Sequence, residues 1–329
     1  MSRYRLQVAA ALGAVTILTP TRYAWFGRRS RPLASSIDAE LSQYERRKYL
    51  LACLREELYA SFYCPGRPVP ARWGTPAPAG ADPRLVEAMS RANPGRGSWE
   101  PGWIVDRLDG EEAVVVHGRL RTRVRLDGCR SASGQVAPGS EVGIRLPNEL
   151  HELSPGYYTV VGEVADTEPP ASFVRVYWNI GRSGAPALVR TLAARLNGEL
   201  VPFRMKVANH PFHLDRCDSA VLYLRADVFR ALAEALRETA AALTTHLRPR
   251  IPALTLELAP GVGLAEDAGG GSFGQRRCSL LAEGIVRAHE QRLVAPGDQL
   301  DAVAARFAED GVLIDAPYLE PSLAGSHAL

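Results

Sequence analysis

Lysine is almost absent from this chain: only Lys48 and Lys206 occur, against 37 arginines. Arginine stays protonated near neutral pH, whereas a lysine that is desolvated or crowded by cations can become a neutral amine and act as a base or nucleophile. Lys206 lies in segment 201–210, where apolar and polar residues alternate as in a strand, so that Arg204 and Lys206 share one face. Lys206 is therefore a candidate base; a solvated strand face is the alternative interpretation.

A second group of polar residues lies on segment 171–179, which is also expected to be a strand. Alternation places Arg175, Tyr177 and Asn179 on one face of it. A face rich in hydrogen-bond donors suits an anion, and an exposed sheet face with an aromatic ladder is the simpler alternative.

Histidine, arginine and aspartate follow Lys206 closely in the sequence. His210 and His213 flank a proline, and an imidazole can deliver a proton near neutral pH. Arg216 offers a planar fork to phosphate, or it pairs with Asp218 as a structural bridge. The His-Pro-x-His spacing gives no sound metal geometry, so a zinc site is not expected.

A glycine-rich stretch over residues 259–274 ends at the expected start of a helix at Ser272. Free backbone N–H groups at such a helix start attract anions. Glu266 lies within the stretch, and Arg276 and Arg277 follow it. The stretch lacks the Gly-Lys-Ser/Thr ending of a P-loop, and the scarcity of lysine also disfavours an ordinary kinase.

The composition is that of a globular protein, with 46% hydrophobic residues in a chain of 329. A net charge of +3, with the arginines spread along the chain, gives no reason to expect a nucleic-acid partner. Five cysteines without a CxxC pair indicate reduced thiols in a cytoplasmic protein. The apolar stretch 6–18 is too short to span a bilayer, and a core helix is expected there rather than a signal peptide.

Hydrophobic periodicity divides the chain near residue 98. Before it, helical spacing predicts one long helix over 37–58 and a short one over 83–92, with a proline-rich connection over 65–83. After it, strands are predicted at 102–109, 112–117, 119–126, 140–146, 157–164, 171–179, around Lys206 and at 218–225, helices at 184–197, 227–246 and 272–291, and an irregular loop at 249–271. We therefore expect an N-terminal helical region, residues 1–98, and an α+β domain, residues 99–329, with a mixed, mainly antiparallel sheet and flanking helices.

Several segments, taken in order, resemble the HopA-type effector family. They are Tyr-Ala-Trp-Phe-Gly at 23–27, Leu-Tyr-Ala-Ser-Phe-Tyr-Cys-Pro-Gly at 58–66, Trp-Glu-Pro-Gly-Trp at 99–103, Arg-Val-Tyr-Trp-Asn at 175–179, and the stretches 202–211, 216–223, 263–267 and 272–274. The resemblance spans nearly the whole chain, including the apolar N-terminal helix, so that helix is expected in the mature fold.

An arginine-rich, free-standing member of this family resembles the lyase component of class V lanthipeptide biosynthesis. There a separate kinase phosphorylates Ser or Thr of a ribosomal precursor peptide, and the HopA-like protein eliminates the phosphate to leave dehydroalanine or dehydrobutyrine. The family is also similar in fold to phosphothreonine lyases, which use a lysine base, a histidine acid and further cations on the phosphate. The Lys-x-His pair that carries the acid in those lyases has no counterpart in this sequence.

The resemblance implies a role for each candidate residue. Lys206 is the expected base, His210 the expected acid, and Tyr177 a third member of the catalytic group. The expected phosphate-binding residues are Arg175, Arg204, Arg216, Arg276 and Arg277, and the further pocket candidates are Asn179, Asp218, Glu266 and Ser272. No metal or organic cofactor is implied.

The expected partners are the precursor peptide and a separate Ser/Thr peptide kinase, with a cyclase as a further candidate and neither nucleic acid nor membrane. Two other functions remain open. One is a non-catalytic HopA-like protein that binds a phosphopeptide or partner without turnover. The other is an enzyme in which Lys206 holds pyridoxal phosphate as a Schiff base.

Overall fold

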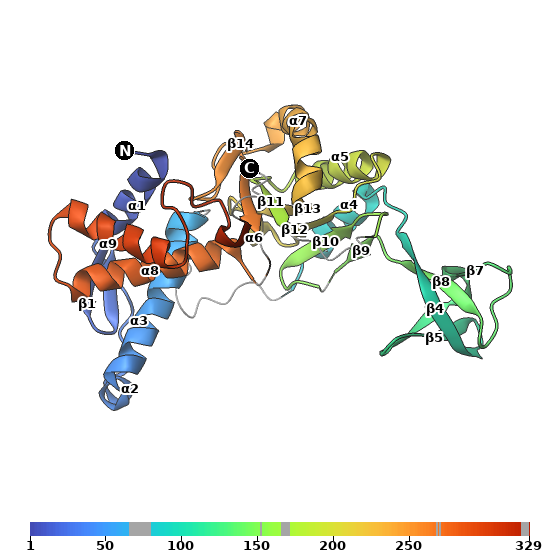
Figure 1. Cartoon of the computed structure of the whole chain (residues 1–329), viewed down its shortest axis with the longest axis horizontal. Helices are drawn as coiled ribbons and strands as arrows, with labels where there is room; N and C mark the ends of the chain where they lie inside the picture. The colour runs from blue at the N-terminus through green and yellow to red at the C-terminus, as the bar shows by residue number, and fades with distance from the viewer. Residues whose placement is uncertain (66–79, 152, 166–171, 268, 270, 324–328) are drawn as a thin grey trace. The chain divides into compact units, whose positions relative to one another are not determined.

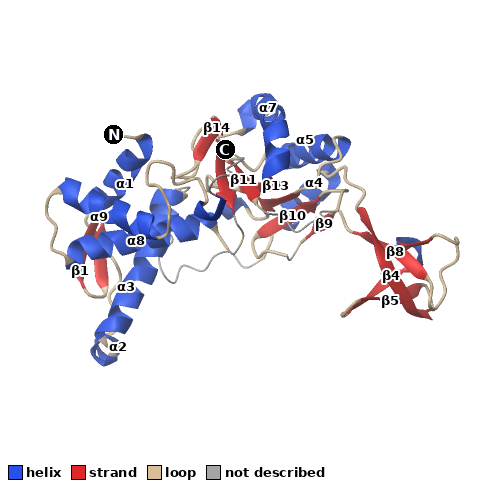
Figure 2. Cartoon of the chain, viewed as in Figure 1, coloured by secondary structure: helices blue, strands red, loops and turns tan. Residues whose placement is uncertain are grey.

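The computed structural model of the chain describes residues 1–65, 80–151, 153–165, 172–267, 269, 271–323 and 329. Their contacts divide them into two compact units. Figure 1 labels the helices and strands along the chain, and Figure 2 colours them by secondary structure. Unit 1 consists of Met1–Gly80, Pro170–Gly184 and His210–Leu329, and unit 2 of Ala81–Pro169 and Ala185–Asn209. The contacts group the first 80 residues with the C-terminal part of the chain. The division of the chain into regions 1–98 and 99–329 stays a prediction.

Four strands of unit 1 lie side by side in an antiparallel arrangement, in the order β14-β15-β11-β13. Their bounds are Leu256–Ala259 for β14, Val262–Asp267 for β15, Phe173–Trp178 for β11 and Ala220–Arg225 for β13. Helix α7, Ala226–Ala242, packs against β11, β13 and β14. Tyr177 and its cross-strand partner Val221 belong to a core that also contains Tyr63 and Phe273. The expected α+β class with antiparallel strands and flanking helices is confirmed.

The N-terminal elements begin with α1, Arg3–Ala14. The helix expected over 6–18 is correct as far as Ala14, after which the chain enters a small antiparallel sheet of β1, Val15–Thr19, β2, Arg22–Trp25, and β3, Arg28–Arg29. The single helix expected over 37–58 is two helices, α2, Ser35–Glu40, and α3, Gln43–Leu58. The reason is a capping box: the Ser42 hydroxyl accepts from the Glu45 N–H, and the Glu45 carboxylate accepts from the Ser42 N–H at 2.9 Å.

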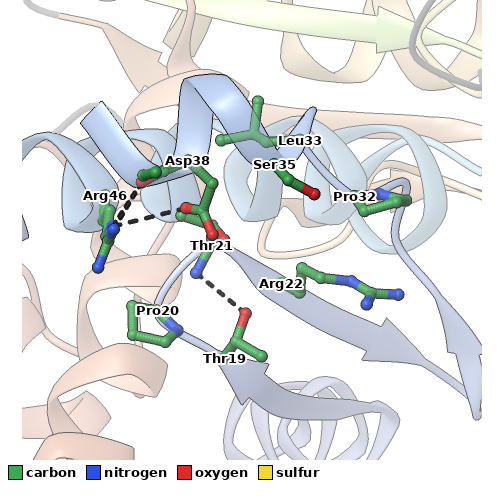
Figure 3. Close-up of a pocket in the computed structure, with 10 residues that line it drawn as sticks. Thr19, Pro20, Thr21, Arg22, Pro32, Leu33, Ser35, Asp38 and Arg46 are labelled. Atoms are coloured by element: carbon green, nitrogen blue, oxygen red, sulfur yellow. Dashed lines mark hydrogen bonds and ion pairs between the residues drawn. The ribbon is translucent and has the colours of Figure 1, made fainter. Parts of the chain in front are cut away.

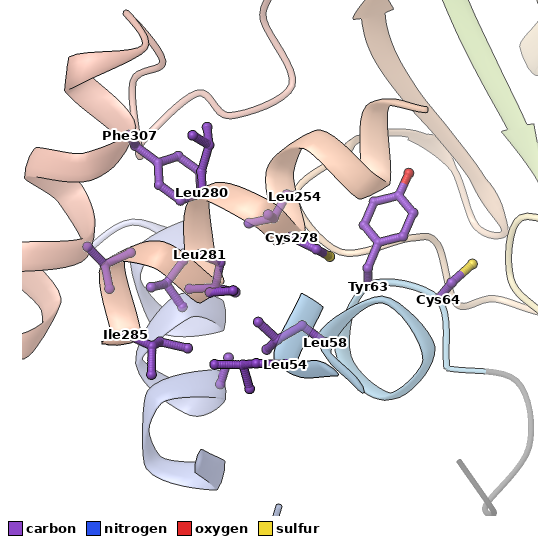
Figure 4. Packing of buried hydrophobic residues seen from close by; sticks show 14 of the residues in the cluster. Leu54, Leu58, Tyr63, Cys64, Leu254, Cys278, Leu280, Leu281, Ile285 and Phe307 are labelled. Atoms are coloured by element: carbon purple, nitrogen blue, oxygen red, sulfur yellow. The ribbon is translucent and has the colours of Figure 1, made fainter. Parts of the chain in front are cut away.

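Helices from both ends of the sequence share the core of unit 1. Helix α8, Phe273–Glu290, packs against α9, Pro296–Glu309, and against α3. Leu54 and Leu58 of α3 belong to the same buried cluster as Leu281, Ile285 and Phe307 (Figure 4). The N-terminal region is therefore part of the same hydrophobic core as the C-terminal helices.

Unit 2 contains three antiparallel strands in the order β12-β10-β9 and a separate five-stranded antiparallel sheet in the order β6-β5-β4-β8-β7. Helices α4, Pro83–Ala92, and α5, Ala185–Gly198, pack against each other. The strand bounds are Ser98–Asp109 (β4), Glu112–His117 (β5), Leu120–Arg125 (β6), Cys129–Ser131 (β7), Glu141–Leu146 (β8), Glu149–Leu150 (β9), Tyr157–Val161 (β10) and Arg204–Ala208 (β12). The five-stranded sheet has its own small core around Trp103 and Val115.

The irregular loop expected over 249–271 is wrong in its middle part, which forms the β14–β15 hairpin. Every residue of β15 is buried, so the strand lacks the alternation by which exposed strands are found. Gly261 makes the turn with φ of 81°, a conformation that disfavours other residues. The proline-rich connection over 65–83 falls largely on residues 66–79, outside the described part, as do residues 268 and 270 of the glycine-rich stretch.

Candidate functional site

Lys206 lies on β12 in unit 2, half-buried, and the strand alternates as expected: Met205 and Val207 are buried on the opposite face. Its cross-strand partner on β10 is Thr159. The Lys206 ammonium lies 4.7 Å from the centre of the Tyr157 ring, a cation–π contact. Tyr157 and Thr159 lie two residues apart on β10, so the lysine shares its face with an aromatic ring and a buried hydroxyl.

Two of the predicted phosphate-binding arginines meet at one carboxylate in unit 1. Arg175, 8% exposed on β11, donates from Nε to Asp267 at 2.7 Å and from its terminal nitrogen to the Gly271 carbonyl. Arg276 of α8 pairs with the other oxygen of Asp267 at 3.3 Å. The three groups come from β11, β15 and α8, and Asp267 fixes the direction of both guanidinium groups.

Arg216 pairs with Asp218, two residues further along the chain, which was one of the two roles expected for it. Its guanidinium binds both oxygens of Asp218, at 2.8 and 2.7 Å, in a bidentate pair. The Tyr59 hydroxyl accepts from Arg216 at 3.0 Å and donates to Asp218 at 3.2 Å, and its ring lies 5.2 Å from the guanidinium. Tyr59 comes from η1, Tyr59–Tyr63, at the end of α3, so the N-terminal region contributes directly to this cluster.

Tyr177 lies on the same face of β11 as Arg175, in a buried aromatic group. Tyr59 and Tyr63 stack with ring centres 5.3 Å apart, and Tyr63 lies 6.2 Å from Phe273. Burial raises the pKa of Tyr177, and the nearby Arg175 charge opposes that rise. Burial therefore keeps Tyr177 protonated, as a hydrogen-bond donor rather than a base.

Arg277 and Glu266 hold the C-terminal segment of the chain in place. Arg277 is 2% exposed and donates to the carbonyls of Pro317 and Leu319 at 2.7 and 2.8 Å. Glu266 is fully buried and accepts from the Glu320 N–H at 3.0 Å. The Glu320 carboxylate in turn pairs with Arg276 at 3.1 Å and Arg277 at 3.5 Å.

The remaining predicted residues have local structural contacts. His210 is the N-cap of α6, Pro211–Leu214, and its Nδ1 accepts from the Phe212 N–H at 3.2 Å. This bond leaves the proton of the neutral imidazole on Nε2. Asn179 donates to the Arg250 carbonyl at 2.8 Å, and Ser272 accepts from the Gln275 N–H as the N-cap of α8. Arg204 is exposed on the same face of β12 as Lys206.

The structure therefore groups the predicted residues into three sets: Lys206 with Arg204 in unit 2, and Arg216 with Asp218 and Arg175 with Arg276 in unit 1. Sequence reasoning missed Tyr59, Tyr157 and Asp267. Tyr59 and Asp267 lie within two of the recognised segments, 58–66 and 263–267, and this resemblance is the signal that could have found them.

Within the described residues, no three His, Cys, Asp or Glu side chains come together as a metal site would require. All five cysteines are buried and none forms a disulfide. Among the helices of the described part, none has the length and apolar character needed to cross a bilayer.

Comparison with known proteins identifies a family for the chain. The model of the HopA1 effector protein family matches residues 149–319, whereas no curated protein sequence matches the chain. Two effector structures are similar to parts of it, from Pseudomonas syringae pv. tomato strain DC3000 (19% identity, TM-score 0.41, 51% of this chain) and from Pseudomonas syringae pv. syringae strain 61 (20%, 0.38, 50%). The matches cover 66% and 62% of those chains, less than two thirds of their length. Because the family model covers just over half of the sequence, the chain belongs to the HopA1 effector protein family.

Proposed function

We propose that this chain is a lyase that eliminates phosphate from phosphoserine or phosphothreonine in a ribosomal precursor peptide, as in lanthipeptide maturation. The neutral amine of Lys206 takes the α-proton of the phosphorylated residue. The electron pair of that C–H bond forms the Cα=Cβ double bond, the Cβ–O bond breaks, and phosphate leaves. The products are dehydroalanine or dehydrobutyrine and inorganic phosphate.

The observation that carries this proposal is the setting of Lys206. It is one of two lysines in an arginine-rich chain, it is half-buried, and it lies beside the Tyr157 ring on a strand face that Arg204 shares. Lys48, by contrast, is exposed on α3 over the Tyr44 ring at 4.9 Å. A base must be able to give up its proton near neutral pH, which a lysine side chain can do and an arginine side chain cannot.

Phosphate binding beside Lys206 is assigned in this proposal to Arg204 of unit 2. Arg204 lies nearest to Lys206 in the sequence, two residues away on the same strand face. Within unit 1, Asp267 and Asp218 hold the guanidinium groups of Arg175 and Arg216 in fixed directions, and these two arginines are the proposed phosphate ligands of that unit. His210, in its imidazolium form, is the proposed proton donor.

The test is mass spectrometry of a phosphothreonine peptide incubated with the purified chain, alone and with a co-encoded kinase. A lyase leaves a peptide lighter by one phosphoric acid and carrying an unsaturated residue. Lys206→Arg keeps the charge and removes the neutral base, so we expect elimination to be lost while phosphopeptide binding persists. Lys48→Arg is the matched control and should keep full activity.

Two outcomes would contradict the proposal. Normal turnover by the Lys206→Arg protein would end the assignment of the base. A peptide that binds but returns unchanged from the wild-type chain, with and without the kinase, would favour the non-catalytic binding protein.

We further propose that the chain binds its peptide kinase through the N-terminal region, residues 1–98. A flexible phosphopeptide alone binds weakly because ordering it costs entropy, and a standing complex raises its local concentration. Phe26 and Tyr44 expose large apolar surfaces in this region, at 76% and 68%. Co-purification of the Phe26→Ser/Tyr44→Ser double variant with kinase and peptide should show a weaker complex; recovery equal to that of wild type would contradict this surface.

A further inference from the structure

Arg22 differs from the other sheltered arginines of the described chain. Every other arginine that is buried or half-buried there has a carboxylate within 4.0 Å, from Arg5 with Asp315 to Arg306 with Glu283. Arg22 is half-buried, and its Nε is buried without a hydrogen-bond partner among the described residues. An arginine that is partly withdrawn from water without a counter-charge is unfavourable unless a ligand supplies that charge.

Arg22 lines a pocket of about 380 Å³ in the N-terminal part of unit 1 (Figure 3). The pocket lies between the β1–β2 turn and α2, and Pro32, Leu33 and Ser35 contribute to its wall. Asp38 Oδ1 lies 3.5 Å from Arg46 Nε, and the described residues show no ion pair between Asp38 and Arg22. Figure 3 shows the Arg22 guanidinium extending away from that pair, on the side of Pro32 and Ser35.

The surroundings of the pocket carry an excess of positive charge. Residues 1–64 contain nine arginines and one lysine against five acidic residues, a net charge of +5, whereas the whole chain carries +3. Arg29 of the β2–β3 hairpin and Arg31, two residues further along the chain, are both exposed. An acidic ligand would therefore be attracted to this region as a whole and held at Arg22.

We propose that this pocket binds an acidic peptide segment, with one Asp or Glu carboxylate seated on Arg22. A guanidinium and a carboxylate match in geometry, and the Ser35 hydroxyl is a further donor at the pocket wall. The Asp38 carboxylate in the same pocket disfavours a doubly charged phosphate more than a singly charged carboxylate. The apolar wall of Pro32 and Leu33 suits the methylene groups of the acidic side chain. This site is independent of the proposed lyase chemistry.

The experiment measures binding of a fluorescent oligoglutamate peptide to the full chain by anisotropy, with an oligoglutamine peptide as the uncharged control. Arg22→Gln should weaken oligoglutamate binding about tenfold, the effect of losing one charge-assisted contact. Arg29→Gln removes the same charge from an exposed position in the same hairpin and is the matched control, with less than about a twofold effect. Equal effects of the two substitutions would overturn the assigned pocket.

A second pair of variants keeps the test valid should Arg22→Gln fail to fold. Ser35 is exposed at the start of α2, and Ser35→Glu offers Arg22 an internal carboxylate, which should block the peptide, whereas Ser35→Gln should not. Unchanged binding by Ser35→Glu would contradict the proposal. Competition at matched ionic strength identifies the ligand class: acetate should displace the peptide at least as well as inorganic phosphate, and clearly stronger displacement by phosphate would overturn the carboxylate assignment.

Discussion

At the scale of single residues, Arg277 is a buried arginine whose hydrogen bonds go to other parts of the chain. It lies in α8, and its guanidinium donates to two carbonyls of the C-terminal segment and pairs with the Glu320 carboxylate. Arg277→Met would leave those buried acceptors without a donor, and we expect a loss of about 3 kcal/mol in the free energy of unfolding. Arg287→Met, on the same helix in an exposed pair with Glu309, should cost less than about 1 kcal/mol.

Denaturant titrations of both variants check this prediction. If the two substitutions shift the unfolding free energy equally, Arg277 does not tie down the C-terminal segment, and its role as a phosphate ligand regains weight.

His213 gives the protein a predictable pH dependence. Burial, followed by the charges of Arg216 and His210, lowers the pKa of His213, while Asp218 opposes the shift. As the pH falls, His213 therefore takes up a proton near pH 6.5 in the unfolded chain, whereas in the folded chain it takes up that proton only at a lower pH. Stability is unaffected above that pH and falls as the pH drops from about 6.5 towards the folded pKa.

We expect His213→Gln to flatten the dependence of unfolding free energy on pH between about 7 and 5. His289→Gln, at an exposed position at the end of α8, is the control and should leave the wild-type slope unchanged. Identical slopes for wild type and His213→Gln would show that another group causes any acid sensitivity in this range.

At the scale of elements, the start of α8 depends on a glycine. A Cβ at position 274 would lie 2.6 Å from Cζ of the buried Tyr63 ring, closer than packing allows. Gly274→Ala should therefore destabilise the protein by about 1–3 kcal/mol, although alanine is the better helix former. Gly13→Ala in α1, where nothing lies within 4 Å, should stabilise it by about 0.5–1 kcal/mol.

Thermal unfolding of the two glycine variants separates the steric effect of a Cβ beside Tyr63 from the higher helix propensity of alanine. If the unfolding midpoint rises for both variants, Tyr63 can move aside without a loss of stability. The aromatic group of Tyr59 and Tyr63 would then be less tightly packed than the distances indicate.

The elements that could be predicted are those with a local signal. Period-2 alternation located the Lys206 strand, and Asp82 before Pro83 marked the start of α4. The β14–β15 hairpin could not be found in this way, because a strand buried on both faces has no alternation. The Ser42 capping box was a readable signal, but the continuous apolar pattern around it outweighed it.

The candidate site was less predictable than the fold. Alternation correctly placed Arg204 with Lys206, and Arg175 with Tyr177. The carboxylate of Asp267 and the hydroxyl of Tyr59 reach Arg175 and Arg216 from segments 92 and 157 residues away in the sequence. Contacts of that range depend on the tertiary fold, which periodicity along the chain does not encode.

At the scale of the whole molecule, removal of the N-terminal region tests more than partner binding. Deleting residues 1–98 removes α3 and exposes Leu281, Ile285 and the rest of the α8 face against which it packs. We expect the truncated chain to aggregate rather than merely to lose the kinase. A truncated chain that stays monomeric and unfolds cooperatively would show that the shared core is dispensable.

Excision of residues 98–146 is the matched control for that deletion. Ser98 and Leu146 are cross-strand partners, so a short glycine-serine linker can join the flanking segments, and the removed sheet has its own core. This shorter chain should keep the fold of unit 1. Its loss of cooperative unfolding would contradict the separate character of the five-stranded sheet.

The sharing of one core by α3 and α9 also sets when the protein can fold during its synthesis. Leu54 leaves the ribosome about 250 residues before Phe307, which at roughly 5–20 residues per second is a delay of some 10–50 seconds. Through that interval the apolar face of α3 has no native partner. The nascent chain should therefore depend on a holding chaperone, or on slow translation of its last helices, more than a protein of equal size whose N-terminal segment folds alone.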